Sequence, residues 1–163
     1  DPGSAFGTGH HETTRLALHA LGEQDLQGRS VLDVGSGTGL LAIAADVLGA
    51  SRAYGVDVDA ATIPVARENA RRNLSRARFA LGSVDHPALP GKFDVVVANL
   101  YAELHAQLMQ EYVRRLLPGG RLFLTGILAR LGPLVVDAVP ATLSLDAQVQ
   151  DGEWLLLELT RRP

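Results

Sequence analysis

The feature that most constrains the fold is residues 31–45, where a short apolar run meets closely spaced glycines and a second apolar run. The run from Val31 to Val34 is typical of a strand buried on both faces. Glycines follow at positions 35, 37 and 39. A turn without side chains lets a ligand reach the backbone and adopts positive φ at little cost. A helix beginning near Thr38 would then point its free amide groups at the turn, where they favour a negatively charged group.

The spacing of these glycines separates two classes of nucleotide-cofactor site. The dinucleotide fingerprint is Gly-x-Gly-x-x-Gly, and its last glycine would fall on Leu40. The sequence has Asp-x-Gly-x-Gly-x-Gly instead, beginning at Asp33. This pattern resembles the first motif of class I S-adenosylmethionine-dependent methyltransferases. The alternative is a tight strand–helix connection that binds no ligand.

Composition indicates one globular domain and excludes some chemistry. The chain has 163 residues, of which 47% are hydrophobic, and it contains no cysteine. Disulfides, thiolate zinc sites and a cysteine nucleophile are therefore excluded. The net charge of -3 gives no bulk attraction to nucleic acid or to an anionic membrane. No segment is apolar over the length of a membrane span. Two arginine groups are interpreted as solvated surface, at positions 71, 72, 76 and 78 and at 161 and 162.

Apolar runs and helix-like periodicity alternate along the chain. Strands are expected at 31–34, 52–58, 78–81, 93–98 and 121–125, and helices at 13–21, 38–48, 60–74, 102–116 and 131–139. Two final strands, 143–150 and 154–160, flank Asp151-Gly152, a dipeptide typical of hairpins. The pattern predicts an α/β fold, and its arrangement of strands resembles the Rossmann-like fold of class I methyltransferases. Its sheet would have seven strands, mostly parallel, with a C-terminal antiparallel hairpin and helices on both faces.

In such a sheet, ligands bind outside the carboxyl ends of the strands. Asp57 ends the second expected strand, and its carboxylate could accept both hydroxyls of a ribose. The alternative is an exposed turn aspartate, as expected for Asp59. Asp33 would either hold the turn through backbone amides or receive the cofactor's ammonium group through water. Gly35 and Gly37 would let the methionine part of the cofactor lie close to the backbone.

Asn99 ends the fourth expected strand and is the candidate catalytic residue. An amine attacks a methyl group only through its lone pair, so it must first lose its proton. A positioned carboxamide oxygen can accept a remaining N–H and aim that lone pair. The alternative is that Asn99 caps the next helix.

The glycine-rich N-terminal stretch, residues 1–12, is predicted to be a loop that covers the cofactor. Phe6 could cover an apolar face of the cofactor, and Thr14 could hydrogen-bond it. Thr13 or Thr14 is expected to cap the following helix. His10 and His11 are adjacent, which is a weak pattern for metal ligands, and no metal is predicted.

Several segments together resemble one family, the bacterial ribosomal protein methyltransferases known as PrmA. They are residues 5–14, 31–45, 55–59, 95–100, 125–128 and 153–154. The resemblance implies that Thr14, Gly35, Asp57 and Asn99 contact S-adenosylmethionine, as does the loop aromatic Phe6. It implies methylation of lysine and N-terminal amines on a large-subunit ribosomal protein, in the cytoplasm.

The resemblance also raises an expectation about domains. Members of the family carry a separate N-terminal domain that docks the ribosomal protein. We therefore expect residues 1–163 to be a single catalytic domain, with the docking domain missing, acting as a monomer without direct nucleic-acid contact. Three alternatives stay open. The first is a methyltransferase that acts on another protein, an RNA or a small amine. The second is a cofactor-binding module without catalysis, and the third is a nicotinamide-dependent oxidoreductase.

Overall fold

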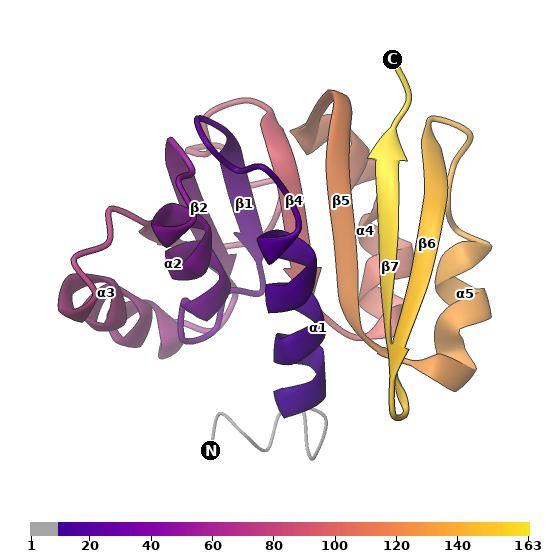
Figure 1. Cartoon of the computed structure of the whole chain (residues 1–163), viewed down its shortest axis with the longest axis horizontal. Helices are drawn as coiled ribbons and strands as arrows, with labels where there is room; N and C mark the ends of the chain where they lie inside the picture. The colour runs from indigo at the N-terminus through magenta and orange to yellow at the C-terminus, as the bar shows by residue number, and fades with distance from the viewer. Residues whose placement is uncertain (1–9) are drawn as a thin grey trace.

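A computed structural model describes residues 10–163, with the backbone alone described at His10 (Figure 1). Seven strands form one sheet in the order β3-β2-β1-β4-β5-β7-β6. The strands are β1 (Ser30–Val34), β2 (Arg52–Asp57), β3 (Arg78–Leu81), β4 (Phe93–Asn99), β5 (Leu116–Leu128), β6 (Leu143–Asp151) and β7 (Trp154–Arg161). The helices are α1 (His10–Gly22), α2 (Leu40–Val47), α3 (Thr62–Arg72), α4 (Ala102–Arg115) and α5 (Gly132–Val136), with a 3-10 turn, η2 (Ala129–Leu131).

The helices cover both faces of the sheet. In Figure 1, α1 and α2 lie in front of the strands and α4 lies behind them. Because side chains alternate along a strand, β1 contributes Val31 to the core under α1 and α2, and Leu32 to the core under α4. All five residues of β1 are buried, as expected for a central strand covered on both faces.

The predicted fold class is confirmed. Strands β3, β2, β1, β4 and β5 pair in parallel, and β7 pairs antiparallel with both β5 and β6. The Asp151-Gly152 dipeptide lies at the β6–β7 turn, where Gly152 has a φ of 60°. A positive φ is what glycine adopts without steric cost, so the hairpin forms where the dipeptide predicts it.

Two expected boundaries are wrong. Helix α1 begins at His10, so the last three residues of the expected loop are helical, and neither Thr13 nor Thr14 caps the helix. Strand β5 begins at Leu116, directly after α4, and includes the Pro118-Gly119-Gly120 segment expected to separate the two elements. The pairing of β5 with β4 jumps between Phe93 and Val95, so the proline lies in an irregularity where no ladder hydrogen bond is required.

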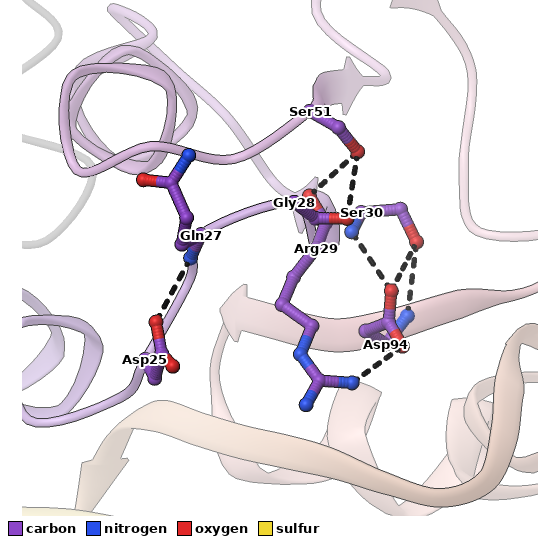
Figure 2. A network of polar contacts seen from close by, with 7 residues as sticks. All are labelled: Asp25, Gln27, Gly28, Arg29, Ser30, Ser51 and Asp94. Carbon is purple, nitrogen blue, oxygen red and sulfur yellow. Dashed lines mark hydrogen bonds and ion pairs between the residues drawn. The ribbon is translucent and has the colours of Figure 1, made fainter.

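A polar network ties the strands together at the end of the sheet where they begin (Figure 2). One carboxylate oxygen of Asp94, near the start of β4, accepts the Ser30 N–H at 2.9 Å and its hydroxyl at 3.1 Å. The Asp94 N–H donates to the Ser30 hydroxyl in return, at 3.0 Å. Ser51, just before β2, donates to the carbonyls of Gly28 and Arg29. The starts of β1, β2 and β4 are therefore fixed relative to one another, which sets where their carboxyl ends emerge.

Candidate active site at the carboxyl ends of the strands

The site lies where the strand order reverses, since β1 is flanked by β2 on one side and β4 on the other. In open α/β sheets this is where ligands bind, beyond the carboxyl ends of the strands. Asp57 ends β2 and Asn99 ends β4, while Gly35 follows β1. In Figure 1 the arrowheads of β1 and β4 point the same way, toward the end of the molecule where α1 begins. The structure thus brings the three predicted strand ends together.

Asp57 is held in position by two backbone amides. Its Oδ2 accepts the Gly37 N–H at 2.8 Å, and its Oδ1 accepts the Asp59 N–H at 2.9 Å. The side chain is half-buried, and each carboxylate oxygen retains a further lone pair. The carboxylate is therefore oriented before any ligand arrives and can still accept hydroxyl groups. Asp59 is exposed, as expected, and accepts the N–H of Ala61.

The three glycines of the turn have different roles, although all have positive φ. A Cβ on Gly35 would lie 2.7 Å from the Leu100 side chain and 3.1 Å from the carbonyl oxygen of Asn99. A Cβ on Gly39 would meet Phe79 at 2.8 Å. A Cβ on Gly37 would have nothing within 4 Å. Gly35 therefore allows β4 to approach the turn, and among the three it is Gly37 that faces open space.

Asp33 is completely buried in the middle of the sheet, below the first turn of α2. Its Oδ2 accepts the Ala42 N–H at 3.2 Å, which is the turn-holding role that the sequence suggests. Among the described residues, its Oδ1 has no hydrogen-bond partner. Burial raises the pKa of Asp33 from 3.8 to about 7, the Ala42 N–H opposes this, and the charge of Asp57 adds to it. The second oxygen is thus left for a ligand, a water molecule or a proton.

Two amides around the glycine turn are not available to an anion. The N–H of Gly37, in the turn, and that of Ala42, in the first turn of α2, already donate to the chain's own carboxylates, Asp57 and Asp33. The expectation that the helix start favours a negatively charged group does not hold for these two amides. The carboxylates that occupy them suit hydroxyl groups and cations better than phosphates.

Asn99 presents an amide oxygen that is buried and has no partner among residues 10–163. Asn99 as a whole is only 8% exposed. The alternative that Asn99 caps α4 is wrong, because the cap residue is Tyr101 and no side-chain cap bond forms. A buried amide oxygen without a partner is costly, so a group that donates an N–H to it would be favoured.

Further buried polar atoms that have no hydrogen-bond partner within residues 10–163 lie beside these residues, and the sequence analysis did not name them as site residues. They are Ser36 Oγ in the glycine turn and Thr125 Oγ1 in β5, opposite Asn99 in the β4–β5 pairing. Thr125 and Gly126 are near the end of a parallel strand, so the strand-end rule applied to β5 would have found them. His105 is also buried, and in the sequence nothing distinguishes it from an exposed helical histidine.

Thr14 is the remaining predicted site residue within residues 10–163, and it lies near the start of α1. Thr14 is half-buried there, and the neighbouring Glu12 has a buried Oε2 without a described partner. Phe6 lies outside the described residues, so its contact with a cofactor stays a prediction. Among residues 10–163, no group of three or more His, Cys, Asp or Glu side chains is arranged to hold a metal ion. No helix in the same range is both long enough and apolar enough to cross a membrane.

Comparisons with known proteins agree with this architecture. The family model described as "Ribosomal protein L11 methyltransferase (PrmA)" matches residues 1–162. A ribosomal protein L11 methyltransferase of Thermus thermophilus is 53% identical over 99% of this chain, and one of Deinococcus radiodurans is 51% identical over 99%. A crystal structure of the ribosomal protein L11 methylase from Lactobacillus delbrueckii subsp. bulgaricus superposes with a TM-score of 0.88. It is 30% identical and covers 95% of this chain and 81% of its own.

The chain corresponds to only part of these two curated relatives. It spans 63% of the length of both the Thermus and the Deinococcus proteins. The comparison therefore covers the methyltransferase fold and its strand-end site, while the remainder of each relative has no counterpart in these 163 residues.

Proposed function

Because this chain belongs to the ribosomal protein L11 methyltransferase (PrmA) family, we propose that it transfers methyl groups from S-adenosylmethionine to amines of a large-subunit ribosomal protein. Residues 1–163 would act as one catalytic unit. Lysine side chains and the N-terminal amine are the proposed acceptors. We further propose that the protein works in the cytoplasm as a monomer, without direct contact to nucleic acid.

The observation that carries the proposal is the placement of Asp57 on the Gly37 amide in the glycine turn and of Asp33 on the Ala42 amide in the first turn of α2. S-adenosylmethionine contains a ribose, an ammonium group, a sulfonium and a single carboxylate, and it has no phosphate. Carboxylate oxygens are suited to the hydroxyl groups and to the positive charges. The residues present therefore fit this cofactor.

Three residues would hold the cofactor. Asp57, already oriented by two N–H groups, would accept the ribose hydroxyls. Gly37 would leave space for the methionine part against the backbone. The free oxygen of Asp33 would accept the ammonium group directly or through water. When bound, S-adenosylmethionine supplies an electrophilic methyl group on positively charged sulfur.

Asn99 would orient the acceptor amine. Its partnerless oxygen would accept one N–H of the neutral amine, which directs the nitrogen lone pair away from Asn99. The carboxamide is not a base, so the amine would lose its proton to solvent before it binds. Thr14, in α1, and Gly35, through its backbone, are proposed as further cofactor contacts, and Phe6 would cover the cofactor.

Calorimetry with S-adenosylmethionine tests the cofactor site. Asp57→Ala should weaken binding by more than about tenfold, or roughly 1.4 kcal/mol. The matched control is Asp59→Ala, two residues away and exposed, which keeps the backbone N–H that Asp57 accepts and should bind normally. Equal affinities for the wild type and Asp57→Ala would overturn the ribose assignment.

A methyl-transfer assay tests the substrate. Labelled cofactor is incubated in parallel with ribosomal protein L11, with ribosomal RNA and with small amines. We expect label on the protein. Label on RNA alone, or on small amines alone, would replace the ribosomal-protein proposal with one of the alternative methyltransferase activities. Cofactor binding without any transfer would indicate a binding module.

A further inference from the structure

His105 is a buried histidine whose two ring nitrogens are both in use. It is completely buried in the first turn of α4. Its Nε2 lies 2.7 Å from the carbonyl oxygen of Thr125, and its Nδ1 lies 2.9 Å from the hydroxyl of Tyr112. Burial lowers the pKa of His105 to about 4, against opposing effects of the backbone at Thr125 and Leu100. The ring is therefore neutral near neutral pH.

Neutrality fixes which nitrogen carries the proton. A carbonyl oxygen can only accept, so Nε2 must be the N–H that donates to Thr125. Nδ1 is then unprotonated and accepts the Tyr112 O–H. Burial raises the pKa of Tyr112, so its hydroxyl keeps its proton. One tautomer satisfies every atom of this chain of hydrogen bonds.

The carbonyl that His105 holds lies beside the catalytic strand end. The same Thr125 oxygen accepts the N–H of Leu100, the residue after Asn99, at 3.2 Å. Thr125 is also paired with Asn99 across the β4–β5 ladder. One carbonyl thus links α4, the end of β5 and the chain leaving β4.

The adjacent glycine shows how closely these ends approach. Gly126 has a φ of 83°, and a Cβ there would lie 2.8 Å from Asn99 Oδ1 and 2.6 Å from the Leu100 carbonyl oxygen. A small shift of β5 would therefore change the space around the amide oxygen. That oxygen has no partner of its own among residues 10–163, so its position depends on the backbone beside it.

We propose that His105 is a positioning residue for Asn99. Its neutral Nε2–H holds the Thr125 carbonyl where it also receives the Leu100 N–H, and this keeps the Asn99 oxygen at the position that accepts the substrate amine. His105 itself does not touch the substrate. The inference rests on the proposed function, because it assigns His105 to the amine-orienting role given to Asn99.

Three variants separate positioning from simple core packing. His105→Leu removes the donor. His105→Gln restores an N–H the same number of bonds from Cα as Nε2. Met109→Ala, one turn further along the same helix and also buried, opens a cavity without removing any hydrogen bond of the His105 chain and is the matched control.

In methyl transfer to ribosomal protein L11, His105→Leu should lower kcat at least about tenfold, because misplacing a group by a fraction of an ångström is costly. The KM for the protein should change less than about twofold, since docking does not involve His105. His105→Gln should recover most of the rate, and Met109→Ala should keep it. A wild-type kcat in His105→Leu would overturn the proposal, as would an equal loss in Met109→Ala or no recovery in His105→Gln.

Hydrogen exchange of the Leu100 amide tests the positioning without any substrate. Its protection should fall at least about tenfold in His105→Leu and return in His105→Gln. Unchanged protection would refute the role of His105. If the wild type transfers no methyl group to L11, the proposed function fails. Hydrogen exchange of the Leu100 amide would still show whether His105 fixes the position of this strand end.

Discussion

The buried carboxyl of Asp33 gives the most quantitative prediction. Its pKa is raised from 3.8 to about 7, chiefly by burial. Because the pKa of Asp33 is higher in the folded state than in the unfolded state, Asp33 favours the folded state when it is protonated. This contribution is fully present below about pH 4, is lost progressively as the pH rises toward 7, and is absent above it. The difference between the two pKa values corresponds to roughly 4 kcal/mol.

Asp33→Asn should remove this dependence. The asparagine oxygen can still accept the Ala42 N–H, so the turn keeps its hydrogen bond. Relative to the wild type, the variant should therefore gain roughly 4 kcal/mol of unfolding free energy between pH 4 and pH 8. Most of the gain should accumulate between pH 4 and pH 7.

His105 changes the stability of the wild type with pH in the opposite direction to Asp33. The contribution of Asp33 is therefore measured as the difference between the wild type and Asp33→Asn. Burial lowers the pKa of His105 from 6.5 to about 4. Its contribution is fully present above pH 6.5 and is lost as the pH falls through 4, which amounts to roughly 3 kcal/mol. The two slopes nearly cancel between pH 4 and 6.5. The wild-type curve should thus be flat there, while Asp33→Asn becomes more stable with rising pH.

Urea unfolding at half-unit pH steps from 4 to 8 measures these slopes. Trp154, the single tryptophan, and far-UV circular dichroism report unfolding. Asp85→Asn is the control, because that carboxylate is exposed in the loop between β3 and β4. If the curves of the wild type and Asp33→Asn run parallel across this range, then burial does not raise the pKa of Asp33 and the reasoning is refuted.

Two further substitutions, and one control, test the two ends of the sheet. Gly126→Ala should lower kcat at least about tenfold, because the new Cβ would lie 2.8 Å from the Asn99 amide oxygen. Gly152→Ala, also at positive φ but facing open space in the hairpin, should cost only about 1 kcal/mol in urea unfolding and leave kcat unchanged. Asp94→Ala removes the acceptor of two Ser30 donors and should cost about 2 kcal/mol of stability. Calorimetry should show unchanged cofactor affinity in Asp94→Ala, since the network is remote from the site; a tenfold loss would contradict that separation.

The fold could be predicted because its signals are local. Strand β1, strand β4 and the closing hairpin each combine an apolar run with a turn residue that ends it. The boundaries that were wrong depend on tertiary contacts. Pro118 interrupts a helix but is tolerated in β5, because the ladder is irregular there and no hydrogen bond is lost. No local sequence pattern predicts such an irregularity in strand pairing.

Some site residues could likewise be predicted from local sequence, while others depend on tertiary contacts. Asp57 and Asn99 follow from the rule that ligands bind at strand ends, and the structure brings both to one edge. Gly35 and Gly37 are equivalent in the sequence, yet Leu100 fills the space above one and leaves the other open. His105 has no local signature at all. Its role depends on Thr125, which is 20 positions away and is brought beside it only by the pairing of β4 and β5.

In the proposed site, the carboxylates of Asp33 and Asp57 would disfavour a phosphate beside the glycine turn. A pyrophosphate within about 4 Å of Asp57 would be repelled by roughly 4 kcal/mol per charge at an effective dielectric constant near 20. It would also find the Gly37 and Ala42 amides already bonded to carboxylates. S-adenosylmethionine has a single carboxylate and two positive charges, so it would be repelled less than a pyrophosphate. With two nearby amides already donating to Asp57 and Asp33, the proposed site would therefore present carboxylate oxygens to hydroxyl groups and positive charge.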